Sequence, residues 1–217
     1  MPRLGGAGTA KRRYPKRLSP ADRREQLLDT GLRIVSEGGF GEVSIASVAE
    51  RGGVSRPVVY DSFGSSAELL DALIRRETAR MAEAVARAMS GLGDPHADPA
   101  AALRAGLGRF LLEVRAMPDT WRLVYFPIDG VPPVLRDRVA TARDELRAPL
   151  RRAFGEWLAR QPAEADEVDL DVLVRIVQGL IQTGARLVLD DPDRFDIPRI
   201  VSLLDYLLAE EHSAEYC

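Results

Sequence analysis

The most constraining feature of this chain is a run of three short helical patterns between Arg24 and Leu70, the first two of which end in paired glycines. Gly38-Gly39 and Gly52-Gly53 can adopt the positive φ angles at which a Cβ would clash. The turn between the second and third patterns has only about three or four residues, so those two helices must cross steeply. This order of elements predicts a helix-turn-helix, a motif that binds DNA.

Each of the three helices carries its own start signal. Ser19 can cap the first, with Pro20 at the first helical position and an acid in the first turn. Ser44 can cap the second, and the third begins at Ser55 with Pro57 tolerated in its first turn. Apolar residues at helical spacing give each helix an inward face. These residues are Leu28, Leu32 and Val35, then Ile45, Val48 and Ala49, then Val59 and Phe63.

The apolar pattern of the third helix leaves Ser55, Arg56, Val58 and Tyr60 without an inward role. A helix that reads DNA needs such a face, because small or apolar groups can contact thymine methyls while Arg or hydroxyl groups reach base edges and phosphates. The alternative interpretation is that these positions are merely solvated. The flanking architecture favours DNA binding.

Four segments of this region resemble the N-terminal domain of the TetR family of helix-turn-helix transcriptional regulators. They are Arg23-Arg24-Glu25-Gln26-Leu27-Leu28-Asp29, Glu37-Gly38-Gly39-Phe40, Val48-Ala49-Glu50-Arg51-Gly52-Gly53-Val54-Ser55 and Tyr60-Asp61-Ser62-Phe63-Gly64-Ser65. The resemblance is specific in order and spacing. It implies an all-helical homodimeric repressor that binds a palindromic operator and releases it when a small-molecule effector enters the C-terminal domain.

The sequence departs from the family at two positions. Many members carry His or Tyr at the place of Ser62, and a phosphate-contacting Lys at the place of Ser66, while Asp61 here adds a negative charge. The usual phosphate contacts are therefore not carried over. Ser65 and Glu68 form a capping box, so the N-terminus of the fourth helix can still offer backbone N–H groups to a phosphate.

A basic N-terminal arm offers a replacement for the missing charge. Residues 1–24 hold eight basic side chains against one acid, a formal charge of +7, and because the whole chain carries −3, the remainder carries −10. Residues 1 to about 18 lack apolar periodicity and are expected to be disordered. The arm can lie along phosphates or enter a minor groove, or it can be a solubilising tail without a role. The candidate DNA contacts are Ser44, Ser55, Arg56, Val58, Tyr60, Ser65, Arg12, Arg13, Lys16 and Arg17.

Beyond the head the pattern is helical throughout, which predicts an all-α fold of about nine helices. A linking helix is expected from about Ser66 to Met89, and a body helix from near Pro99 to near Met117-Pro118. A short piece around Trp121 follows, then a long helix that Pro149 should kink or divide, then two apolar helices. The expected divisions are a basic arm (1–18), a DNA-binding head (19–64), the linking helix (65–93) and a ligand-binding and dimerisation body (94–217).

Both tryptophans and several other aromatic residues fall in the body, where an apolar and aromatic cavity with a few polar groups would suit a small effector. The alternative is that this aromatic stripe is core. The candidate pocket residues are Phe110, Trp121, Tyr125, Phe126, Phe154 and Trp157, with Gln178 and Thr183 as hydrogen-bonding partners.

The last two helical patterns are apolar around more of their circumference than one buried stripe requires, so a second face must be covered. They resemble the helix pair that forms an intersubunit four-helix bundle in the family. Two recognition helices related by a two-fold axis also suit a palindromic site. The alternative is that both faces are used within one subunit. The candidate interface residues are Ile181, Gly184, Val188, Ile200, Leu204 and Leu207.

Other classes of function have little support in the sequence. The two histidines, His96 and His212, form no triad with spacing logic, and the single cysteine, Cys217, cannot pair or build a thiolate metal cluster. No catalytic residues, metal or cofactor are therefore expected. The sequence shows no apolar h-region after the basic N-terminal segment, and no apolar run that we expect to be long enough to span a bilayer. These features predict a cytoplasmic protein.

Three functions remain open at this point. The first is a ligand-responsive repressor that recognises a specific operator. The second is a small-molecule-binding helical protein whose DNA-binding head is vestigial through Asp61, Ser62 and Ser66. The third, weaker one is a DNA-compacting protein that binds any sequence through its basic arm. Salt dependence and competition by random DNA distinguish them.

Overall fold

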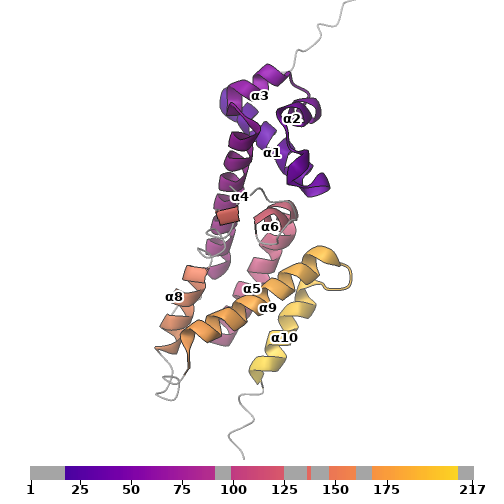
Figure 1. Ribbon diagram of the computed structural model, residues 1–217. Coiled ribbons are helices and arrows are strands. Elements are labelled where there is room, and N and C mark those ends of the chain that lie inside the picture. The colour runs from indigo at the N-terminus through magenta and orange to yellow at the C-terminus, as the bar shows by residue number, and fades with distance from the viewer. Residues whose placement is uncertain (1–17, 91–98, 125–135, 138–146, 160–167, 210–217) are drawn as a thin grey trace, which may run out of the picture.

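A computed structural model describes residues 18–90, 99–124, 136–137, 147–159 and 168–209. Within these residues there are nine α-helices, one 3₁₀ turn and no strand, so the all-α prediction is confirmed. The N-terminal part holds α1 (Pro20–Gly38), η1 (Phe40–Glu42), α2 (Ile45–Gly52) and α3 (Arg56–Phe63). The long α4 (Ser66–Met89) leads from this head into the body (Figure 1). The body holds α5 (Pro99–Ala116), α6 (Pro118–Val124), α8 (Arg147–Leu158), α9 (Leu170–Asp190) and α10 (Ile197–Ala209).

The helices of the head begin and end at their sequence signals. The Ser19 hydroxyl accepts a hydrogen bond from the backbone N–H of Asp22 at 3.1 Å, and Gly39 ends α1 with φ +84°. Ser44 caps α2, and the cap is reciprocal because the hydroxyl of Ser47 accepts from the Ser44 backbone N–H at 2.9 Å. Gly53 then adopts φ +64°, a left-handed conformation that favours glycine. The turn from α2 to α3 is fixed by these local contacts.

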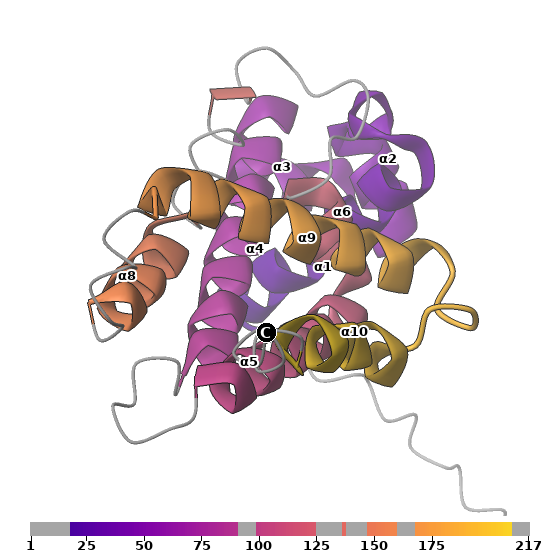
Figure 2. The ribbon, with the colours of Figure 1, turned by 90° about the horizontal axis from the view of Figure 1, so that it is seen from below.

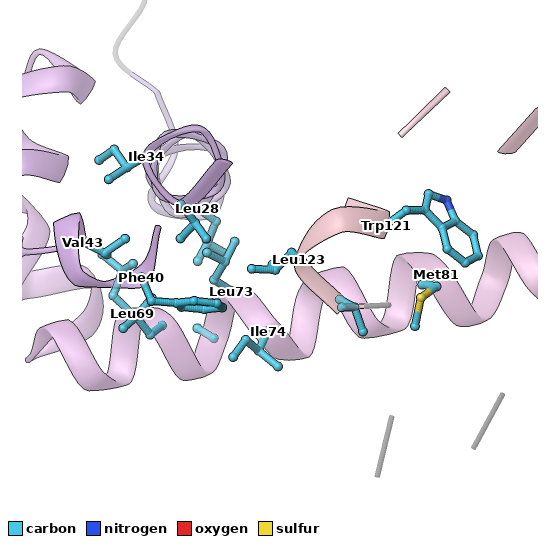
Figure 3. Packing of buried hydrophobic residues seen from close by; sticks show 14 of the residues in the cluster. Leu28, Ile34, Phe40, Val43, Leu69, Leu73, Ile74, Met81, Trp121 and Leu123 are labelled. Carbon is cyan, nitrogen blue, oxygen red and sulfur yellow. The ribbon is translucent and has the colours of Figure 1, made fainter. Parts of the chain in front are cut away.

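The apolar core is continuous from the head into the body along α4. Leu28 and Phe40 pack with Leu69 and Leu73 at the head end of α4 (Figure 3). Further along α4, Met81 belongs to the same core as Trp121 of α6. Burial of one such side chain stabilises the fold by about 1.5–3 kcal/mol. The head is therefore packed onto the body, and α4 belongs to both.

Helix α1 also connects the two parts. It packs against α2, α3 and α4 in the head and against α6 of the body. The approach to α4 is close at Gly31, where a Cβ would lie 3.3 Å from Cδ2 of Leu69. A Cβ at this position would require the Leu69 side chain to shift by a few tenths of an ångström.

In the body, α5 packs against α4, α9 and α10, while α9 runs across the molecule and also contacts α8 (Figures 1 and 2). Pro149 lies in the first turn of α8, where proline is tolerated, and the earlier part of the long helix expected there lies outside the described residues. Helix α9 is long and apolar enough to cross a bilayer by length and composition, so the expectation that no stretch could do so is wrong. Only a third of its most apolar stretch is buried within this chain.

Candidate nucleic-acid interface

Helix α3 lies at the end of the molecule opposite α8 and α10 (Figure 1). Val59 and Phe63 are buried, whereas Arg56, Tyr60 and Asp61 are exposed. Tyr60 is 53% exposed, although its ring is large and apolar. Of the residues that the sequence left without an inward role, Ser55, Arg56 and Tyr60 are thus exposed.

Ser55 and Arg56 carry polar groups at the start of α3 for which the described residues show no capping bond and no ion pair, respectively. Ser55 occupies the N-cap position of α3, yet its hydroxyl makes no side-chain capping bond among the described residues. Arg56 likewise has no ion-pair partner within the described part of the chain. Val58 is half-buried, so only part of its side chain can meet a ligand. Ser55 and Arg56 are the groups best placed to donate to phosphates or base edges.

Other candidate residues are already committed to capping. The Ser44 hydroxyl donates to Ser47 Oγ at 3.0 Å besides accepting from the Ser47 backbone N–H. The Ser65 hydroxyl accepts from the Glu68 backbone N–H at 3.1 Å, which is one half of the expected capping box. The Glu68 carboxylate lies beside Gly64, because a Cβ there would be 2.9 Å from Glu68 Oε2. This places a second acid, besides Asp61, near the turn from α3 to α4.

Two arginines that contribute to the positive charge of residues 1–24 make contacts within the head. Arg24 donates to the backbone carbonyl of Ser62, and its guanidinium lies 4.2 Å from the centre of the Phe63 ring. Arg23 donates to Gln26 at 2.6 Å. Arg24 of α1 therefore contacts the last turn of α3 through both a hydrogen bond and a cation–π interaction. The candidate arm residues Arg12, Arg13, Lys16 and Arg17 lie outside the described residues.

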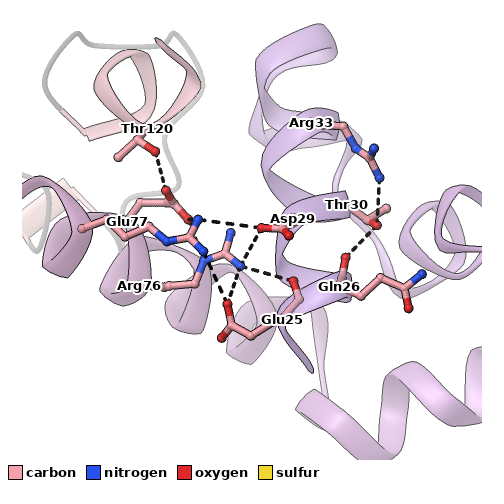
Figure 4. Close-up of polar contacts among 9 residues, drawn as sticks. Glu25, Gln26, Asp29, Thr30, Arg33, Arg76, Glu77 and Thr120 are labelled. Carbon is pink, nitrogen blue, oxygen red and sulfur yellow. Dashed lines mark hydrogen bonds and ion pairs between the residues drawn. The ribbon is translucent and has the colours of Figure 1, made fainter. Parts of the chain in front are cut away.

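A buried polar cluster connects the head to the body (Figure 4). Glu77 of α4 is fully buried, pairs with Arg76 Nε at 2.7 Å and accepts a hydrogen bond from Thr120 of α6 at 2.6 Å. Nη1 of Arg76 reaches Glu25 at 3.0 Å and Asp29 at 2.9 Å, both on α1. Burial by itself lowers the pKa of the Arg76 guanidinium. The carboxylates of Glu77, Asp29 and Glu25 outweigh this effect, so the pKa of Arg76 is raised above its ordinary value.

This buried cluster was not predicted from the sequence, although the sequence contains a signal for it. Glu77 lies on the apolar stripe of α4, three residues after Ile74 and four before Met81. A carboxylate on the inward, apolar side of a helix is expected to be buried, and a buried charge needs hydrogen-bonding or oppositely charged partners.

The comparisons with known proteins agree with this geometry. Residues 27–73 match the family model described as bacterial regulatory proteins, tetR family. Over 164 residues the chain is 30% identical to the HTH-type transcriptional regulator BetI of Burkholderia thailandensis, covering 75% of this chain and 82% of the relative. The chain belongs to the TetR family. It is a DNA-binding transcriptional regulator, in a family that is not enzymatic.

Further relatives of this TetR-family regulator differ in how much of their length they share with it. It is 35% identical to the BetI of Stenotrophomonas maltophilia over 91 residues, which span 42% of this chain and 45% of that relative. A TetR-like regulator from Rhodococcus sp. RHA1 superimposes with a TM-score of 0.68 at 26% identity, covering 91% of this chain and 99% of the other. A SmeT–triclosan complex superimposes with a TM-score of 0.66 at 21% identity, covering 87% and 91%. That last likeness shows the fold alone.

The pocket residues predicted for this regulator are only partly brought together. Trp121 is fully buried and meets the half-buried Phe110 edge-on, with ring centres 5.0 Å apart. Phe154 is half-buried on α8, and Gln178, buried on α9, accepts from Arg147 at 3.2 Å. Thr183 is exposed and bonds the Gly179 carbonyl, so it faces away from the interior. Tyr125, Phe126 and the side chain of Trp157 lie outside the description.

The predicted dimer residues fall on more than one face. Gly184 and Val188 are buried within the subunit, where a Cβ on Gly184 would lie 3.4 Å from Cγ2 of Ile200. Ile181, Ile200 and Leu204 are half-buried, and the side chain of Leu207 is not described. The large apolar side chains that α9 and α10 expose are different ones. They are Val172, Ile176, Leu180, Leu203 and Tyr206.

Proposed function

We propose that this regulator is a homodimeric repressor that binds a palindromic operator and releases it when a small-molecule effector enters its body. The observation that carries the proposal is the exposed face of α3, which presents Arg56, Tyr60 and a Ser55 hydroxyl that makes no capping bond among the described residues. Guanidinium and hydroxyl groups of this kind contact base edges and phosphates in the major groove. Such a regulator works where the DNA is, so we place it in the cytoplasm.

A second copy of the chain is the proposed partner for the exposed face of α9 and α10. Val172, Ile176 and Leu180 are each more than half exposed and lie one helical turn apart. Gly179, on the same side of α9, has open space where a Cβ would be, so a neighbouring helix can approach closely there. A dimer related by a two-fold axis would present two α3 helices, one to each of two half-sites about 34 Å apart. Gly184 and Val188, two of the six residues predicted for the interface, are buried within the subunit, so we propose that this exposed face takes their place in the dimer contact.

The effector is proposed to be a mainly apolar small molecule that binds between α5, α6 and α8. Support comes from the aromatic pair Phe110 and Trp121 and from Phe154 on α8. The structural neighbour SmeT was solved with triclosan, a precedent for a small molecule in this fold. The pair formed by Gln178 and Arg147 supplies polar groups that could orient such a ligand.

The test is binding of the purified chain to the DNA immediately upstream of its own coding region, at about physiological salt with excess random competitor DNA. A discrete complex with two chains per site that resists the competitor supports a specific dimeric regulator. A complex that random DNA removes, and whose affinity falls steeply with salt, indicates binding driven by charge alone.

One alternative has an observation of its own. Asp61 and Glu68 place two acids close to the turn where family members often hold a phosphate. If these acids have abolished DNA binding, the chain is a small-molecule-binding protein with a vestigial head. Asp61→Asn with Glu68→Gln would then create DNA affinity that the natural chain lacks, whereas in a working regulator the double variant only strengthens existing binding.

A further inference from the structure

A series of polar contacts runs from body helix α6 through α4 to α1, and the neighbouring residue Arg24 of α1 contacts helix α3. The series starts at Thr120 of α6, passes through Glu77 and Arg76 of α4, and reaches Glu25 and Asp29 of α1. Figure 4 shows these side chains pointing toward one another from three helices. None of these contacts belongs to the proposed DNA face or to the aromatic candidates for the pocket.

The first step of the series is tightly constrained. Glu77 is fully buried and is held on both carboxylate oxygens, Oε2 by Thr120 and Oε1 by Arg76. Charge-assisted hydrogen bonds of this kind are short and directional, and a buried carboxylate tolerates the loss of a donor poorly. A displacement of α6 that carries Thr120 away from Glu77 must therefore change the position of the carboxylate or leave it undersatisfied.

The second step joins α4 to α1. Arg76 is 11% exposed, and its Nη1 serves the Glu25 carboxylate, the Glu25 backbone carbonyl and Asp29 at once. Arg80 adds longer contacts to the same two acids, at 3.6 and 3.7 Å. A guanidinium is planar, so a rotation that improves its bond to Glu77 alters all of its bonds to α1.

The third step joins α1 to α3. Arg24 precedes Glu25 on α1, donates to the Ser62 carbonyl and stacks on Phe63 in the last turn of α3. A shift of this first part of α1 is therefore transmitted to the end of the recognition helix.

We propose that Thr120, Glu77, Arg76 and the acids of α1 form a coupling relay through which the position of α6 sets the orientation of α1 and of α3. The inference rests on the proposed function, because Trp121 of the candidate pocket follows Thr120 directly on α6. An effector that moves Trp121 moves the first donor of the relay. These residues are positioning residues and do not contact DNA.

Two threonines next to Glu77 give a matched test. Thr120→Val removes the hydroxyl that donates to Glu77 and preserves the size of the side chain. Thr78→Val makes the same chemical change one residue along α4 from Glu77, where the buried hydroxyl has no hydrogen-bond partner among the described residues. Thr120→Ser, which keeps a hydroxyl, serves as the conservative rescue.

The primary measurement is backbone hydrogen exchange of the full chain, without DNA or effector. We expect Thr120→Val to speed exchange in α1 and α3 by at least about fivefold, the lower end of typical coupling strengths. Thr78→Val and Thr120→Ser should leave both helices near wild type. A purely local role of Thr120 would accelerate exchange in α6 and the adjoining part of α4 alone, and that result would overturn the relay.

The second measurement is affinity for the upstream DNA, in wild type, Thr120→Val, Asp29→Asn and the double variant. If Thr120 and Asp29 act in one relay, the effects of their substitutions on DNA affinity should be non-additive. The double variant should then bind no more than about twofold more weakly than the weaker of the two single variants. Additive losses would overturn the relay while leaving DNA binding intact. If the wild type binds no DNA, the proposed function fails, and the exchange experiment still decides whether the relay exists.

Discussion

The head and the body are built from the same material, amphipathic helices around one continuous core, but their decisive contacts lie at different distances along the chain. In the head, Ser19, Ser44 and Gly53 act within about one turn of the helix end that they define. In the body and at its junction with the head, the contacts that matter join distant residues, such as Glu77 and Thr120. The helix ends of the DNA-binding head are therefore specified by local contacts, whereas its junction with the body depends on contacts between distant residues.

The junction should give the largest effect. Glu77→Ala leaves the Thr120 hydroxyl and Arg76 Nε without their acceptor, and we expect the free energy of unfolding to fall by about 2–4 kcal/mol, since each buried donor left unsatisfied costs about 1–3 kcal/mol. Urea unfolding measures this change. Glu83→Ala is the control, since Glu83 is exposed on the same helix, and should cost less than about 0.5 kcal/mol. Equal losses in the two variants would mean that the buried cluster is not a special link between head and body.

The exposed face of α9 should give the next largest effect, on assembly. We expect Leu180→Glu to produce monomers by light scattering and to weaken operator binding by about 100-fold, because two linked half-site contacts are lost. Leu112→Glu makes the same change at a similarly exposed leucine of α5 and should leave the dimer intact. A Leu180→Glu protein with the mass of two chains would contradict the proposed interface.

Within the head, the recognition face should respond to single side chains. We expect Arg56→Ala to cost about 1–3 kcal/mol of operator binding and to relax base preference at one position of each half-site. Arg51→Ala is the control, because Arg51 lies on α2 and pairs with Glu37. A competition assay with single-base operator variants reads out both quantities. Equal losses of operator affinity and base preference in Arg56→Ala and Arg51→Ala would show that α3 has no special role in recognition.

The N-terminal arm extends the test of the head to charge. Removal of residues 1–17 should weaken operator binding by about tenfold at physiological salt and flatten the dependence of log affinity on log salt, because each lost phosphate contact reduces the slope by about 0.9. Binding at several salt concentrations measures both. An unchanged affinity and slope would show that the arm is a tail without a role in binding.

The smallest effect should come from a surface contact of the body. A hydrogen bond from Arg87 lowers the pKa of Glu113 below its ordinary 4.5. The pair therefore stabilises the fold above that pH, and the stabilisation is lost as the pH falls through the lowered pKa. Arg87→Gln should remove this part of the acid sensitivity, seen as a smaller drop in Tm on acidification. Because Arg87 is well exposed, the change should be slight.

The sequence was enough to predict the fold and most helix ends. The predicted bounds of the linking helix, Ser66 to Met89, are those of α4, and the caps at Ser19 and Ser44 are confirmed. These features depend on backbone groups within a few residues of the side chain that satisfies them. Local sequence therefore contains the information that determines them.

The remaining features depend on which helix meets which. Periodicity placed Val188 and Thr183 on one apolar helix but could not show that Val188 would be buried against the subunit's own core and Thr183 exposed. The same limit applies to Glu77, whose partners lie on two other helices. Rotation of a helix about its axis is set by packing, which no single segment encodes.

The position of α1, packed at once on α3, α4 and α6, has a thermodynamic consequence. A coupling between two ligands has no direction, so an effector that lowers operator affinity by some factor must itself be bound more weakly by that factor when the regulator is on DNA. In the proposed repressor, the operator would thus act as a negative effector of the body. The concentration of small molecule needed to free a gene would then rise with the strength of its operator, so that one protein could answer the same signal at different thresholds on different promoters.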